Sequence, residues 1–108
     1  MTDTAFAEAC NGAVVAWIST FPTESRLEAY LATLDEALRK PVRKAVEALR
    51  RDAERFIEAW PEAIGMEGLE AFYPVHHAHL KAMHPWLNDA AWARIRSFSG
   101  WYIWHEGV

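Results

Sequence analysis

The stretch PVRKAVEALRRDAERFIEAW, residues 41–60, decides the fold class of this chain. Its apolar side chains recur at alternating steps of four and three residues: Val42, Val46, Leu49, Ala53, Phe56 and Trp60. These steps place the side chains on one face of an α-helix, because the helix makes one turn in about 3.6 residues. Pro41 suits the first turn of such a helix, where its missing N–H costs nothing. The stretch therefore predicts a long amphipathic helix.

The polar face of the same helix carries much of the positive charge of the chain. The basic residues between positions 39 and 55 are Arg39, Lys40, Arg43, Lys44, Arg50, Arg51 and Arg55. Acids four residues away are expected to form the ion pairs Arg43–Glu47, Glu47–Arg51 and Arg50–Glu54. The formal net charge is −4, and no aromatic residue interleaves with the basic ones before Phe56. We therefore interpret the run as a solvated helix face and disfavour nucleic acid as a partner.

The segments before residue 41 also show helical spacing. The first stripe comprises Phe6, Cys10, Ala13, Trp17 and Phe21, with Val14 and Ile18 beside it. A helix that is apolar around most of its circumference needs cover on several sides, and Gly12 within it favours a close helix crossing. A second helix is expected to start near residues 23–25, because Ser25 and Glu28 have capping-box spacing. Its expected apolar face is Leu27, Tyr30, Leu31, Leu34 and Leu38.

The C-terminal half of the chain is predicted to hold the remaining helices. A loop follows Pro61, and a short helical piece over 69–73 precedes Pro74. Further helices are expected over 75–84 and from Asn88, as N-cap, to about Glu106. No strand-like alternation of apolar and polar residues occurs over more than four residues. The prediction is an all-α, single-domain bundle of four to five helices spanning residues 1–108.

Composition narrows the class of protein further. The chain has 108 residues, of which 52% are hydrophobic and 24% are charged, as in ordinary globular domains. Its one cysteine, Cys10, excludes an intramolecular disulfide and any CxxC motif. We find neither an apolar run long enough for a bilayer nor a basic signal-peptide n-region, and so expect a cytoplasmic protein without membrane contact. The abundance of alanine, and of arginine over lysine, indicates a bacterial source.

Four of the five histidines lie between positions 76 and 84: His76, His77, His79 and His84. One helix face can offer His76 with either His79 or His84 to a metal, and a further ligand would come from elsewhere. The candidates for that further ligand are His105, Glu67 and Glu70. The recognised spacings HExxH and ExxH are absent. A metal- or haem-binding helical protein is thus the alternative hypothesis, beside structural histidines and a pH-sensitive role.

Signatures of catalysis are weak in this chain. Cys10 belongs to an apolar stripe, where burial raises the pKa of a thiol. Ser97 and Ser99 lack a GxSxG turn, and Gly65 and Gly68 do not form a phosphate-binding loop. A carboxylate site built from Glu62, Glu67 and Glu70 would lie in a solvated loop. We therefore expect no enzyme and no cofactor.

The tryptophans are the feature that folding explains least. The chain has six, and the last helix ends in FSGWYIWH, residues 98–105. A helix packed on one side cannot easily bury every aromatic ring of that run, and Trp and Tyr are favoured interface anchors. We expect a non-enzymatic interaction domain, of regulator, adaptor, inhibitor or immunity type, that binds a protein partner or a second copy of itself. The expected contact residues are Phe98, Trp101, Tyr102, Trp104 and His105. The alternative is that these rings plug the end of the bundle and cover the first helix.

Overall fold

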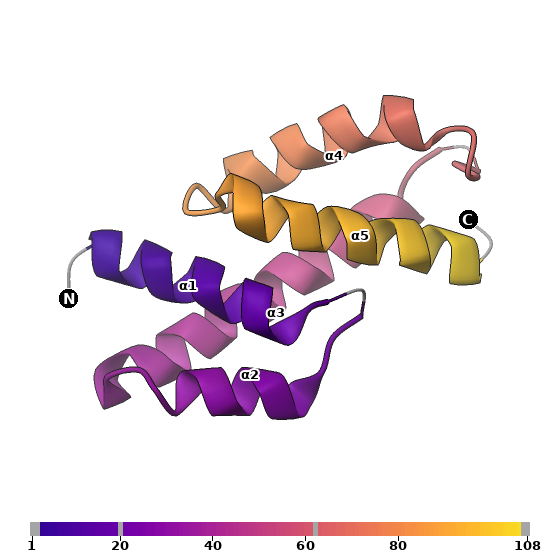
Figure 1. Cartoon of the computed structure of the whole chain (residues 1–108). Helices are drawn as coiled ribbons and strands as arrows, with labels where there is room; N and C mark the ends of the chain where they lie inside the picture. Colours follow the sequence, from indigo (N-terminus) through magenta and orange to yellow (C-terminus); the bar gives the residue numbers. More distant parts are fainter. Residues whose placement is uncertain (1–2, 20, 62, 107–108) are drawn as a thin grey trace.

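A computed structural model describes residues 3–19, 21–61 and 63–106 of the chain. The described part forms an all-α bundle without a β-strand, which confirms the predicted fold class (Figure 1). The helices are α1 (Asp3–Trp17), α2 (Glu24–Leu31), α3 (Glu36–Glu58), α4 (Leu69–Met83) and α5 (Asp89–Glu106). Helix α1 packs against α2, α3 and α5, whereas α4 packs on α3 and α5 at the other side of the bundle.

Helix α1 is buried on several sides, as its broad apolar stripe predicts. Cys10, Ala13 and Val14 are fully buried, and Trp17 is almost so. Gly12 leaves room for the ring of Tyr30 from α2, because a Cβ atom at this position would lie 2.1 Å from the hydroxyl oxygen of that tyrosine. The glycine therefore accommodates the end of a side chain, and a close crossing of the helices at Gly12 stays a prediction.

A buried asparagine ties α1 to the connection between α4 and α5. The side-chain amide of Asn11 donates to the carbonyl oxygens of Ala7, at 2.9 Å, and Trp86, at 2.7 Å. Its Oδ1 accepts the backbone N–H of Asn88 at 3.0 Å. Asn88 in turn accepts the N–H of Ala91 at 2.9 Å, which confirms the predicted N-cap of the last helix. Asn11 thus fixes where α5 begins relative to α1.

Helix α3 contributes to two hydrophobic cores. Val42, Val46, Leu49 and Ala53 of this helix belong to the main core around α1. Its last turn supplies Ile57 to a smaller core with Ile64, Phe72 and Ile103. The predicted stripe is confirmed up to Ala53. Beyond it, Ile57 takes the buried position, and Phe56 and Trp60 pack half-buried against the smaller core.

Several predicted helix boundaries are wrong. Helix α1 ends at Trp17 rather than Phe21, because the chain turns back there and the N–H of Thr23 bonds to the carbonyl of Trp17. Helix α3 begins five residues before Pro41, and α4 continues through Pro74 as a single helix. Each proline is the sixth residue of its helix, and a proline near a helix start removes only one backbone hydrogen bond.

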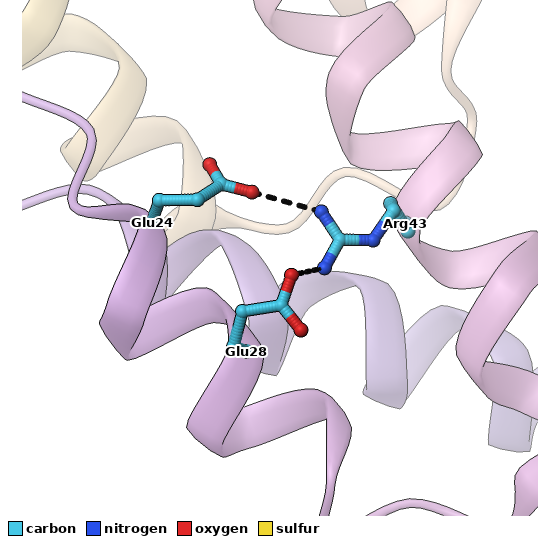
Figure 2. Close-up of polar contacts among 3 residues, drawn as sticks. All are labelled: Glu24, Glu28 and Arg43. Carbon is cyan, nitrogen blue, oxygen red and sulfur yellow. Dashed lines mark hydrogen bonds and ion pairs between the residues drawn. The ribbon is translucent and has the colours of Figure 1, made fainter.

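Arg43 joins α3 to α2 instead of pairing along its own helix (Figure 2). Its Nη1 donates to Oε1 of Glu24 at 2.9 Å, and its Nη2 donates to Glu28. Of the three predicted pairs along α3, the described residues contain only Arg50–Glu54, at 3.1 Å. The predicted capping box is also wrong, because Ser25 lies inside α2 and Glu28 is engaged with Arg43. Tertiary packing brings the two helices close enough for these contacts.

Replacing Asn11 with Leu is expected to destabilise the fold by about 2 kcal/mol. The variant keeps the branched arrangement of four side-chain heavy atoms but leaves the Trp86 carbonyl and the Asn88 N–H without their partner. Urea unfolding followed by circular dichroism measures this change. Thr33→Ala is the matched control, because it removes an exposed side-chain bond to the backbone, and it should change stability by less than about 0.5 kcal/mol. Equal unfolding midpoints for Asn11→Leu and the wild type would contradict the role of Asn11.

Candidate interaction surface

The aromatic end of α5 divides between core and surface. Phe98 is 1% exposed and belongs to the main core, so we correct its predicted role as a contact residue to a structural one. Trp101 and Tyr102 are half-buried, whereas Trp104 is 66% exposed. His105 is exposed, and its ring stacks on Trp101 with a centroid distance of 4.9 Å. Four of the five predicted residues therefore reach the surface.

A groove of about 440 Å³ runs beside these residues, between α5, α3 and the α1–α2 connection. Its apolar lining consists of Phe21, Pro22, Phe98, Trp101 and Tyr102. The Phe21 ring is 52% exposed, and its centroid lies 6.0 Å from that of Trp101. We call this feature the aromatic groove.

The apolar spacing of the sequence did not predict the contribution of Phe21 and Pro22 to this groove. It placed Phe21 on the buried stripe of the first helix, but Phe21 lies beyond the end of α1. The Phe21-Pro22 pair is the sequence feature that could have indicated this, because helical conformation is disfavoured for a residue that precedes proline. A large apolar residue in a connecting segment is free to face a neighbouring helix from outside the core.

Arg50 lines the aromatic groove and is held by several neighbours. Its Nε donates to Oε1 of Glu54 at 3.1 Å. Its Cζ lies 5.6 Å from the ring centroid of Trp17 and 5.8 Å from that of Phe98, within the range of cation–π attraction. The charge of Arg50 is therefore compensated within the protein.

Tyr102 lies near several carboxylates. Its hydroxyl donates to Glu58 across the gap between α5 and α3. This hydrogen bond raises the pKa of Tyr102 well above its ordinary value, and burial and the negative charges of Glu58, Glu54 and Glu106 raise it further. Tyr102 remains a neutral phenol at physiological pH, and its surroundings are negatively charged.

The predicted histidine cluster is dispersed over different neighbours. His84 contacts Asp52 of α3, with Nε2 and Oδ2 2.8 Å apart. His79 stacks on Phe56 with a centroid distance of 4.5 Å, and His77 stacks on Trp92 at 4.4 Å. Among the residues that the structure describes, no group of three or more His, Cys, Asp or Glu side chains could hold a metal ion. No arrangement in the described residues therefore favours the alternative hypothesis of a metal site.

The imidazole of His76, on α4, is fully buried against α3 and α5. Its ring stacks on Phe56 at 5.2 Å and lies edge-on to Trp92 at 5.8 Å. Neither ring nitrogen has a hydrogen-bond partner within the described part of the chain. Burial lowers the pKa of His76 to about 4, and the nearby imidazoles of His79 and His77 add to this effect while the backbone of Ala53 opposes it. His76 therefore stays neutral in the folded protein.

Cys10 behaves as the sequence predicts for a structural cysteine. It is fully buried in the main core, and burial raises the pKa of its thiol to about 12. A thiol of this kind is not a nucleophile at neutral pH. Cys10 does not line the aromatic groove.

Comparisons with known proteins found no matching family model, no matching curated protein and no matching solved structure. Across residues 3–19, 21–61 and 63–106, none of the helices combines the length and the apolar character that crossing a membrane requires.

The burial of neutral His76 makes stability depend on pH. The pKa of His76 in the folded state, about 4, lies below the ordinary value of 6.5. The neutral imidazole therefore contributes fully to the free energy of unfolding above pH 6.5, and this contribution is lost as the pH falls toward 4. The free energy of unfolding is expected to fall by about 3 kcal/mol over this pH range, because one pKa unit corresponds to about 1.4 kcal/mol. Urea unfolding at a series of pH values tests this expectation.

A His76→Leu variant should lack this part of the pH dependence, since leucine does not titrate. The matched control is His105→Leu, which removes an exposed imidazole on α5 and should keep the wild-type dependence. A wild-type pH profile in His76→Leu would contradict the assignment to His76.

Proposed function

We propose that this chain is a non-enzymatic protein-interaction domain that binds a protein partner, or a second copy of itself, through the end of α5. The contact residues are Trp101, Tyr102, Trp104 and His105, together with Phe21 from the α1–α2 connection. The observation that carries the proposal is the exposure of Trp104, at 66%, on α5, and of Phe21, at 52%, which lines the aromatic groove. Exposed aromatic rings lose the stabilisation that burial would provide, and such rings are frequent anchors of protein interfaces.

The chemistry of the groove supports binding rather than catalysis. Arg50 is paired with Glu54, and Tyr102 is bonded to Glu58 with its pKa raised, which disfavours a role as a base or nucleophile. The thiol of Cys10 lies in the core and away from the groove. Regulator, adaptor, inhibitor and immunity-type roles all use such a binding surface.

The double substitution Trp101→Ala and Trp104→Ala is expected to abolish association and leave the helices intact. Each change removes an aromatic anchor, and losing one anchor typically weakens an interface by more than about 1 kcal/mol. Native mass spectrometry of the untagged protein measures self-association. Affinity capture from cells of the source organism, compared between wild type and variant, measures partner binding. Far-UV circular dichroism checks the fold.

The matched control is Met83→Ala, which removes an apolar side chain with 57% exposure at the end of α4. This control should retain both assembly and the captured partner. The proposal fails if the double variant assembles and captures proteins as the wild type does. Trp104→Ala alone guards against a folding defect, because its mostly exposed ring contributes little to the core.

A further inference from the structure

The aromatic groove offers ring faces near negative charge. Trp101 and Phe21 form its outer wall, and Glu106, on the last turn of α5, lines it from the same helix as Trp101. Glu106 has no ion-pair partner within the described residues. It also lies at the carboxyl end of a helix, where the helix dipole adds partial negative charge. The open end of the groove therefore favours a cation.

The charges around the groove do not cancel. Three carboxylates, those of Glu54, Glu58 and Glu106, act together on Tyr102. Arg50 is the cation that lines the groove, and Glu54 already binds it. The lining thus holds two carboxylates, Glu54 and Glu106, and one cation, and an anionic or purely apolar occupant would leave the charge of Glu106 uncompensated.

Beside the groove, Arg50 shows how one guanidinium contacts aromatic rings and a carboxylate at the same time. Arg50 lies over Trp17 and Phe98 and is bonded to a carboxylate, which is the arrangement that a second guanidinium could repeat on Trp101 and Phe21. Arginine suits it better than lysine, because its planar head stacks on rings and binds carboxylates through two N–H groups.

Several arginines of the chain are held by contacts within the chain. Arg43 binds Glu24 and Glu28, Arg39 donates to backbone carbonyls, and Arg96 lies over the ring of Tyr73 at 4.7 Å. Arg50 itself lines the groove. The formal net charge of −4 disfavours a second copy as the source of the arginine, because two negatively charged copies repel each other.

We infer that the aromatic groove binds an arginine side chain of a partner protein. Its guanidinium lies against Trp101 and Phe21 and near the carboxylate of Glu106, and apolar neighbours of that arginine contact Trp104. This inference rests on the proposed function and names the chemistry of the partner for the same surface.

The test uses the full chain and a labelled peptide, Gly-Ser-Leu-Arg-Ala-Arg-Leu-Ser-Gly. A second peptide carries citrulline in place of both arginines, which keeps the shape and removes the charge. Fluorescence anisotropy at low salt measures both affinities. We expect the arginine peptide to bind at least about tenfold more tightly than the citrulline peptide, and its affinity to fall as salt is added.

Three variants locate the binding site. Glu106→Gln should lower the affinity for the arginine peptide about three- to tenfold, and Trp101→Ala should lower it about tenfold. Glu36→Gln is the matched control, because it removes an exposed carboxylate at the opposite end of α3 from Glu58, and it should bind as the wild type does. Glu106 is exposed, so its substitution should not disturb folding.

Any of three results would overturn the inference. The first is equal binding, or no binding, of the arginine and citrulline peptides, and the second is equal affinity in Glu106→Gln and Glu36→Gln. If the tryptophan double variant still loses its association in either case, the proposed function stands and only the arginine chemistry fails. Self-assembly that needs Trp104 and that the arginine peptide does not displace would also overturn the inference, because a second copy then occupies the surface. If the double variant associates normally, the proposed function itself fails.

Discussion

The burial of α1 is the constraint on which the rest of the structure depends. A helix with apolar side chains around most of its circumference is stable in water only when other helices cover it, and here α2, α3 and α5 do so. The polar atoms of Asn11 then need partners inside this cover. The side chain of Asn11 hydrogen-bonds to the backbone of Trp86 and Asn88, and these bonds fix the start of α5.

The exposed aromatic surface follows from this arrangement. Helix α5 must turn Ile95 and Phe98 toward the main core and Ile103 toward the smaller one. Because successive residues of a helix point about 100° apart, Trp104 then faces outward and Trp101 lies at the edge. The turn after α1 brings Phe21 against this edge and completes the groove. The same packing that stabilises the bundle therefore leaves aromatic rings exposed.

The histidines illustrate how far residue type alone can mislead. Their clustering between 76 and 84 suggested metal ligands, because imidazole is a common ligand and several lie on one helix. In the structure, His84 bonds to Asp52, and His76, His77 and His79 stack on aromatic rings of α3 and α5. These neighbours are distant in the sequence, so spacing along α4 could not reveal them.

The sequence by itself determined the all-α class, the burial of Cys10, the N-cap at Asn88 and the aromatic character of the last helix, but not where each helix begins and ends. These properties depend on local periodicity and on residues a few positions apart, which a single sequence displays. Only the tertiary structure decided that Phe98 is core, that Phe21 and Arg50 line a groove with Trp101, and that Arg43 binds α2. Each of these contacts joins residues that are far apart along the chain or on separate helices, and their meeting depends on how the helices pack around α1.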